Sequence, residues 1–261
     1  AVNRELSGMD PFWFKLTNLV IHLLNGALVY VLIRSVLTLR KTITSANEGN
    51  PSAIAAAVAA VWLLHPAQLT SVLYVVQRMT SLSATFVFAG LITYVAARSR
   101  LLAGRRTNAL LFVGVPFWGL LSCLTKENGV LLFLFAFVLE ACLFDFHVTG
   151  SKSRVTLRAF FVVFVGLPAL ALLAFFVLNP GWLLNPNPSR PFTVLERLMT
   201  ESRALFLYVE ILFVPIMGSL ALYYDDFAIS RGLFDPPTTA VAIAAVVIGL
   251  IMAVVMRRRL P

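Results

Sequence analysis

Long apolar runs, each followed by a short polar or basic segment, recur along the whole sequence. Two of these runs, residues 159–178 and 239–256, contain no charged residue and are long enough to cross the hydrocarbon core of a bilayer as helices. A helix satisfies its own backbone hydrogen bonds in lipid, which a loop does not. The pattern therefore predicts an all-α fold, a polytopic transmembrane helical bundle with about seven to eight membrane segments.

Basic residues follow every second run and predict the orientation of the spans. The expected spans are residues 12–33, 52–64, 82–97, 109–124, 129–146, 159–178 and 239–256. The basic loops contain Arg34, Arg40 and Lys41, then Arg98, Arg100, Arg105 and Arg106, and then Lys152, Arg154 and Arg158. Because cytoplasmic loops carry an excess of Lys and Arg, these loops are expected inside, and residues 65–78 and Lys126 are expected outside.

The C-terminal third leaves two topologies open. Residues 179–203 are expected to form an outer loop that ends in an amphipathic stretch, and residues 204–223 form either a full span or a short re-entrant helix interrupted at Pro215. Re-entry places the acidic segment 225–235 outside and the final arginines inside, as the charge rule favours, whereas a full span reverses both. Re-entry is the favoured prediction.

Composition excludes several other classes. With 59% hydrophobic and 13% charged residues, the chain has too little polar surface for a water-soluble globule. Its net charge of +9 comes from residues clustered in loops, so nucleic-acid binding is not expected. Residues 1–261 are expected to form a single transmembrane domain, and the polar start at Ala1 and the ending just past an apolar run indicate a fragment.

Motifs that would identify an enzyme class directly are absent from the sequence, which has no GxSxG, HExxH, Walker or GxGxxG pattern. Glu140 and Glu210 lie singly near span ends, so a proton relay is not expected and transport is disfavoured. Cys123 and Cys142 have no CxxC motif or His at ligand spacing, so they are expected to be small core residues and no metal site is predicted. The adjacent acids at 225 and 226 could serve as a base, but a solvated acidic loop is favoured.

Three polar side chains in the first expected span share one helix face. Asn18, His22 and Asn25 are spaced i, i+4 and i+7. An unpaired amide or imidazole is costly in hydrocarbon, so this face must meet partner helices or a wet cavity. Hydrogen bonding between helices is the favoured interpretation, and a role facing a substrate stays open.

A second group of candidates lies in the predicted outer segments. Arg78, with His65 and Gln77 in the same segment, offers a planar fork of donors that suits a phosphate. An arginine in this place can also simply anchor a helix at the head groups. Lys126 either pairs with Glu127 at the surface or adds a second positive charge to a site for an anionic lipid.

Four segments, in this order, resemble a known family. They are residues 8–33 (GMDPFWFKLTNLV and onward), 62–94 (WLLHPAQLTSVLYVV), 120–146 (LLSCLTKENGVLL) and 203–239 (RALFLYVEILFVP), with His65-Pro66 and Asp235-Pro236-Pro237 the most specific parts. The chain resembles bacterial multi-spanning proteins related to the tetratricopeptide-containing transmembrane O-mannosyltransferases, which are GT-C-class glycosyltransferases. The resemblance implies a GT-C-like fold, a polyprenyl-phosphate-linked sugar donor, a protein or glycan hydroxyl as acceptor, and a periplasmic active face on the bacterial inner membrane.

The resemblance also implies roles for individual residues. Those expected on the outer surface are His65, Gln77, Arg78 and Lys126, and those expected beside the donor and acceptor cavity are Arg203, Tyr208 and Asp226. Family members keep a catalytic acid in a first outer loop, after a helix that precedes the equivalent of Phe12. That helix and loop are absent here, as are tetratricopeptide repeats, so the catalytic residue and any divalent metal are unknown.

Two other functions stay open beside the transferase. The first is a non-catalytic membrane scaffold or assembly protein, whose polar face binds partner helices or lipid. The second is a lipid-linked oligosaccharide ligase or polymerase, which would also use outward cations. The coding sequence upstream of Ala1 would help to discriminate among the three functions, because an acidic pair in a first outer loop favours the transferase and its absence favours the scaffold. A very large periplasmic loop between later spans favours the ligase.

Overall fold

The structure, a computed structural model, describes residues 10–44, 49–148, 150–185, 192–215 and 227–257. Within these ranges the chain is helical, with an isolated bridge between Gly232 and Asp235 and no strand, which confirms the predicted all-α class. The chain divides into two compact units, Ala1–Pro168 (unit 1) and Ala169–Pro261 (unit 2).

Five helices in the described ranges are long and apolar enough to cross a membrane. They are Pro11–Thr44, Val75–Leu102, Glu127–Phe144, Ser151–Leu178 and Thr238–Met256. Pro51–Leu64 and Pro66–Leu73, bent by 56° relative to each other, make a sixth if they form one span. Leu110–Thr125 is shorter, about 24 Å against about 30 Å of hydrocarbon. The count of about seven to eight spans stays a prediction.

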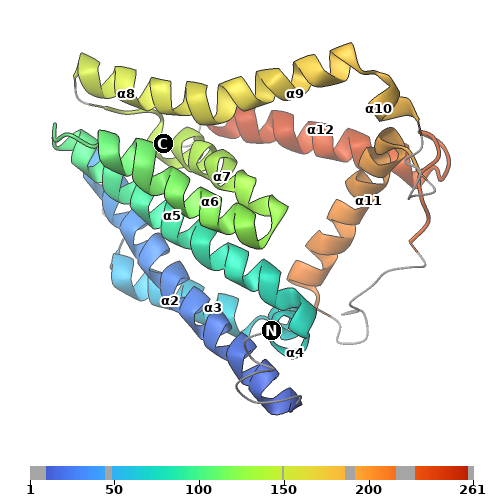
Figure 1. Ribbon diagram of the computed structural model, residues 1–261, viewed down its shortest axis with the longest axis horizontal. Helices are drawn as coiled ribbons and strands as arrows, with labels where there is room; N and C mark the ends of the chain where they lie inside the picture. Colours follow the sequence, from blue (N-terminus) through green and yellow to red (C-terminus); the bar gives the residue numbers. More distant parts are fainter. Residues whose placement is uncertain (1–9, 45–48, 149, 186–191, 216–226, 258–261) are drawn as a thin grey trace. The chain divides into compact units, whose positions relative to one another are not determined.

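Unit 1 is organised around α5 (Arg78–Leu102), which has neighbours on several sides (Figure 1). Its main helical neighbours are α2 (Pro11–Thr44), α6 (Val115–Thr125) and α7 (Leu131–Leu139), and α3 (Pro51–Leu64) packs on α2. The order of contacts along each pair shows that α2 and α7 run parallel to α5, whereas α6 runs antiparallel. This alternation agrees with the up-and-down order of spans expected from the sequence.

Local sequence sets both ends of α3. At the start, the Asn50 side chain accepts a hydrogen bond from the Ser52 backbone N–H at 3.0 Å, and Pro51 occupies the first turn, where its missing N–H costs nothing. At the end, Pro66 disfavours a helical conformation of His65, which is extended. The connection to α5 then runs through η1 (Pro66–Gln68), α4 (Leu69–Leu73) and η2 (Val75–Gln77).

Aromatic side chains fill the core of unit 1 between α5, α6, α7 and α8 (Ser151–Phe161). Phe133 stacks on Phe164 with ring centroids 4.8 Å apart, and Phe160 stacks on Tyr94 at 5.8 Å. Three π-helical turns lie among these helices in the described part of the chain. They are η3 (Leu110–Gly114), η5 (Glu140–Phe144) and η6 (Val162–Gly166), the last of which continues into α9 (Leu167–Leu178).

A tight turn, η4 (Glu127–Val130), joins α6 to α7. A Cβ atom at Gly129 would collide with the backbone of Ser122 and Cys123 in α6. Only glycine therefore allows the turn to approach the helix this closely. The close approach fixes where Lys126, the residue directly after α6, stands relative to the rest of the bundle.

A buried ion pair between Arg98 and Glu140 joins α5 to the end of α7. Both side chains are fully buried, with Arg98 Nε 2.6 Å from Glu140 Oε2 and Arg98 Nη2 2.8 Å from Oε1. The Tyr94 hydroxyl donates to Glu140 Oε2 at 2.5 Å, and Arg98 Nη2 also donates to the His147 carbonyl at 2.8 Å.

Two predictions are wrong at this ion pair. Arg98 is not in a basic loop, because α5 continues to Leu102, and Glu140 is not isolated, because it pairs with Arg98.

The prediction for the cysteines is wrong as well. Cys123 and Cys142 are free thiols, but both are exposed rather than packed in the core. An apolar run has a lipid-facing side as well as a core-facing side, and the sequence alone did not reveal on which side each cysteine lies.

Unit 2 begins within α9 and contains α10 (Gly181–Leu184), α11 (Val194–Phe213) and α12 (Thr238–Arg257). Thr193 and Glu196 form a capping box at the start of α11, and the backbone N–H of Thr193 donates to the Glu196 carboxylate and lowers its pKa. The amphipathic stretch and much of the segment 204–223 therefore belong to one helix that begins at Val194. Residues 216–223, on which the choice between span and re-entry depends, lie outside the described residues.

Replacing Glu140 with Leu should lower the free energy of unfolding by about 3–5 kcal/mol, because Arg98 would stay buried without its counter-charge. The double variant Arg98→Leu, Glu140→Leu should recover much of this loss, since it buries no unpaired charge. Denaturant titration of the full chain in detergent micelles measures both. A single variant as stable as the wild type would contradict the role given to the ion pair.

Candidate functional site

Arg78 begins α5 and is held against the start of α2. Its Nε donates to Asn18 Oδ1 at 2.9 Å, its Nη2 donates to the Phe14 carbonyl at 3.0 Å, and its guanidinium lies 5.6 Å from the centre of the Phe14 ring. A guanidinium has five N–H groups, and these two bonds use two of them. Arg78 therefore joins α5 to α2. Its remaining N–H groups form no hydrogen bond with the described residues.

Lys126 lies at the same end of unit 1 as Arg78. Its Nζ donates to the hydroxyl of Thr80 at 2.8 Å, and Thr80 is in the first turn of α5, two residues after Arg78. Residues two apart on a helix point to different sides. The two cations therefore flank the first turn of α5, Arg78 on the side of α2 and Lys126 on the side of α6.

His65 and Gln77 lie in the connection from α3 to α5 that leads to this turn. The His65 Nδ1 accepts a hydrogen bond from the Ala67 backbone N–H at 3.2 Å, and the Gln77 backbone N–H donates to Tyr74 at 3.1 Å. Gln77 directly precedes Arg78. The structure thus brings Gln77, Arg78 and Lys126 to one end of α5, with His65 at the far end of the same connection.

The polar face of α2 is almost completely buried. Asn18, His22 and Asn25 are 1%, 6% and 2% exposed. The Asn18 amide donates to the carbonyls of Val72 and Tyr74, at 3.2 and 3.1 Å, and His22 Nε2 lies 3.0 Å from the Leu63 carbonyl. These contacts join α2 to the end of α3 and to the connection after it.

Asn25 connects the polar face of α2 to α5. Its amide donates to the Ser81 carbonyl at 2.9 Å, and its Oδ1 accepts from the Thr85 hydroxyl at 2.7 Å. Asn25 thus uses both its donor and its acceptor inside the bundle. This geometry suits hydrogen bonding between helices, the interpretation that the sequence favours.

In unit 2, Arg203 holds the segment that leads into α12. Its Nη1 donates to the Ala228 carbonyl at 2.8 Å and to the Ser230 hydroxyl at 3.4 Å, and its guanidinium lies 4.8 Å from the centre of the Phe227 ring. Arg203 also lines a groove of about 470 Å³ with Phe206, Glu210, Thr238 and Val241. Tyr208 is exposed, and Asp226 lies outside the described residues.

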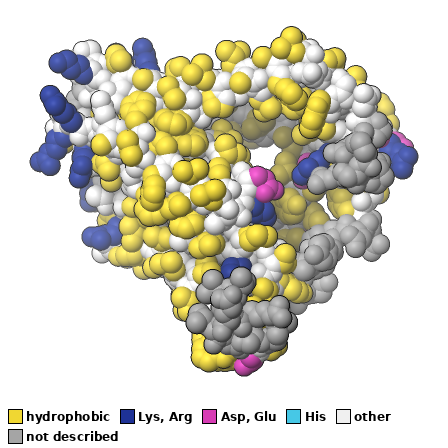
Figure 2. Space-filling view, in the orientation of Figure 1, with side chains coloured by type: hydrophobic (Ala, Val, Ile, Leu, Met, Phe, Trp, Pro, Cys, Tyr) yellow, Lys and Arg dark blue, Asp and Glu magenta, His cyan; other side chains and the backbone are white. Residues whose placement is uncertain are grey.

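Most exposed basic residues of unit 1 gather at the other end of α5. They are Arg34 and Lys41 in α2, Arg100 in α5, Arg105 and Arg106 after it, and Lys152, Arg154 and Arg158 in α8. Figure 2 shows dark blue side chains collected along the left edge of the view, which agrees with this clustering. We call this end of unit 1 the basic end.

A set of side chains that could hold a metal ion is not present among the described residues, in which no three His, Cys, Asp or Glu side chains come together.

The cluster of Tyr94, Arg98 and Glu140 was not predicted from the sequence. A signal for it exists, because Tyr94 and Arg98 are spaced i, i+4 and share a helix face.

The chain matches no known protein family, no curated protein and no solved structure in the three comparisons made. The likeness to GT-C-class glycosyltransferases therefore rests on the sequence segments alone and stays a prediction.

Ser230 is the centre of the polar contacts that fasten residues 227–237. It is fully buried, its N–H donates to the Thr200 hydroxyl at 2.9 Å, and its own hydroxyl lies 2.9 Å from that of Thr239. Ser230→Ala should lower the free energy of unfolding by about 1–3 kcal/mol, because the buried partners of its hydroxyl lose a hydrogen bond. In limited proteolysis of the full chain, the Ser230→Ala variant should be cleaved faster than the wild type within residues 227–237.

A matched control for this variant is Ser202→Ala. Among the described residues, the Ser202 hydroxyl donates only to the Met199 carbonyl in its own helix, at 2.7 Å, so its loss should leave the cleavage rate unchanged. Equal cleavage of the two variants would contradict the account of Ser230.

Proposed function

We propose that the chain is the membrane core of a GT-C-type glycosyltransferase that uses a sugar linked to polyprenyl phosphate. The acceptor is a hydroxyl group on a protein or glycan, and transfer occurs on the periplasmic face of the bacterial inner membrane. The first turn of α5, flanked by Arg78 and Lys126, receives the phosphate of the lipid-linked donor.

The observation that carries the proposal is the pair of cations at the end of α5 remote from the basic end. The positive-inside bias accounts for basic residues on the cytoplasmic side and gives no reason for Arg78 and Lys126 on the other. A phosphate at the surface of a bilayer needs cationic donors. Arg78 and Lys126 supply a guanidinium and an ammonium on two sides of one helix turn.

The chemistry assigned to these cations is stabilisation of a leaving group. When the acceptor oxygen bonds to the anomeric carbon, the bond from that carbon to the phosphate oxygen breaks and negative charge develops on the lipid phosphate. A base takes the proton of the acceptor hydroxyl. Cations already in place at the phosphate favour the transition state over the substrate, because the phosphate gains charge as the reaction proceeds.

Lys126 is the sharper probe of this role, because Arg78 also fastens α5 to α2. Lys126→Gln should lower the rate of sugar transfer by about tenfold or more, as the loss of a donor to a developing charge does. Thr80→Val, which removes the hydroxyl that holds Lys126, should give a smaller loss. Lys152→Gln removes an exposed charge at the basic end and should leave the rate unchanged.

Transfer is measured with membranes that contain the full-length gene product and a radiolabelled polyprenyl-phosphate sugar. A rate for Lys126→Gln equal to that of Lys152→Gln would overturn the role of Lys126. No transfer by the full-length product, with any of several polyprenyl-phosphate sugars, would overturn the transferase itself.

The second candidate is a non-catalytic membrane scaffold. One observation favours it: Asn18, His22, Asn25 and part of the Arg78 guanidinium are used in contacts between helices. A scaffold would bind its partner equally well when Lys126 is replaced, and it would release no lipid phosphate from any donor.

A further inference from the structure

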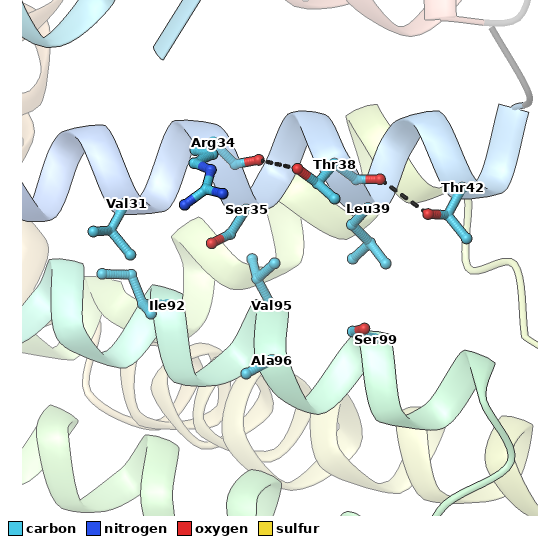
Figure 3. A pocket seen from close by; sticks show the side chains of 10 residues that line it. All are labelled: Val31, Arg34, Ser35, Thr38, Leu39, Thr42, Ile92, Val95, Ala96 and Ser99. Atoms are coloured by element: carbon cyan, nitrogen blue, oxygen red, sulfur yellow. Dashed lines mark hydrogen bonds between the residues drawn. The ribbon is translucent and has the colours of Figure 1, made fainter. Parts of the chain in front are cut away.

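A groove runs between α2 and α5 near the basic end of unit 1 (Figure 3). Its volume is about 380 Å³. The residues of α2 that line it are Val31, Arg34, Ser35, Thr38, Leu39 and Thr42, and those of α5 are Ile92, Val95, Ala96 and Ser99. The groove belongs to unit 1 alone and lies apart from the turn that carries Arg78 and Lys126.

The lining changes from apolar to polar along the groove. Val31 and Ile92 form one end, and Thr42 and Ser99 form the other (Figure 3). Arg34 lies between these ends, with its guanidinium turned toward α5. A cavity that is apolar at one end and hydroxyl-rich at the other matches an amphiphile better than it matches a uniformly apolar helix.

The polar part of the groove lies at the level of lipid head groups. From Arg78 to Ser99, α5 rises about 30 Å, which is the thickness of the hydrocarbon core. With Arg78 and its partner Asn18 at one surface of the bilayer, Ser99 stands at the other, and Arg34, about 24 Å along α2 from Asn18, lies just below it. Val31 and Ile92 then lie in the hydrocarbon, where an acyl chain would be.

Arg34 carries a charge that no carboxylate among the described residues neutralises. Its guanidinium is exposed and forms no ion pair with any side chain in the part of the chain that the structure describes. The Thr38 hydroxyl donates to the Arg34 carbonyl at 2.8 Å, and the Thr42 hydroxyl donates to the Thr38 carbonyl at 3.0 Å. These two hydroxyls are thus committed to the backbone, and Arg34 is the main donor toward the groove.

We infer that this groove binds one anionic phospholipid. The phosphate lies on Arg34 with Ser35 beside it, and the first part of an acyl chain lies between Val31, Ile92 and Val95. The surrounding charges favour an anionic lipid over a zwitterionic one, because Lys41 and Arg105 stand at the same end and attract net negative charge. The inference does not depend on the proposed transferase activity.

The test is native mass spectrometry of the full chain, released from detergent micelles and titrated with dioleoylphosphatidylglycerol or dioleoylphosphatidylcholine. The wild type should bind the phosphatidylglycerol more tightly. Arg34→Gln should weaken this binding about fivefold, as the loss of one cation near a lipid phosphate does. Arg100→Gln is the matched control, because Arg100 is exposed at the same end but does not line the groove.

A second variant tests the groove rather than the charge. Ala96 is exposed and small, and Ala96→Phe should fill the groove and weaken the binding of both lipids while leaving the thermal stability unchanged. Equal effects of Arg34→Gln and Arg100→Gln would overturn the inference. So would unchanged phosphatidylglycerol binding by Ala96→Phe, or a dimer of the chain that Ala96→Phe abolishes without changing lipid binding.

Discussion

The buried pair of Arg98 and Glu140 is the interaction on which the arrangement of unit 1 depends. Neither charge reaches the surface, so each is tolerated only because the other is within hydrogen-bonding distance. The pair fixes the end of α7 and the turn at His147 against α5. Because α5 is one continuous helix, its register at Arg98 also sets the position of its first turn.

The two ends of α5 consequently have different properties. At the first turn, Arg78 and Lys126 flank the helix and keep donors for an anion. Toward the last turns, a groove that Arg34 and Ser99 line lies between α2 and α5. Between the ends, Asn25 and Ser83 hold α5 to α2 and α6 by hydrogen bonds that lipid cannot replace. Each candidate site thus lies at one end of α5, and the polar contacts between them join α5 to its neighbouring helices.

Much of this fold could be predicted from the sequence. Apolar runs gave the helices, Pro66 gave the break after α3, and the spacing of Asn18, His22 and Asn25 gave a buried face. These features follow from local periodicity and backbone geometry, which a sequence displays directly.

Other features could not be predicted, because they depend on contacts between distant residues. Arg98 looks like a loop arginine until Glu140, 42 positions later, is placed opposite it. Cys123 and Cys142 look like core residues until the side of the helix that faces the bundle is known. The groove at Arg34 is likewise a product of how two helices pack, since neither helix contains it alone.

The proposed function requires Arg78 and Lys126 to lie at the opposite face of the membrane from the basic end. The most direct test introduces Glu127→Cys or Arg105→Cys in the full chain, after Cys123 and Cys142 have been replaced by Ser, and labels sealed spheroplasts with a membrane-impermeant maleimide. We expect the cysteine at 127 to be labelled in intact spheroplasts and the cysteine at 105 to be labelled only after lysis. Labelling of both from the same side would contradict this arrangement.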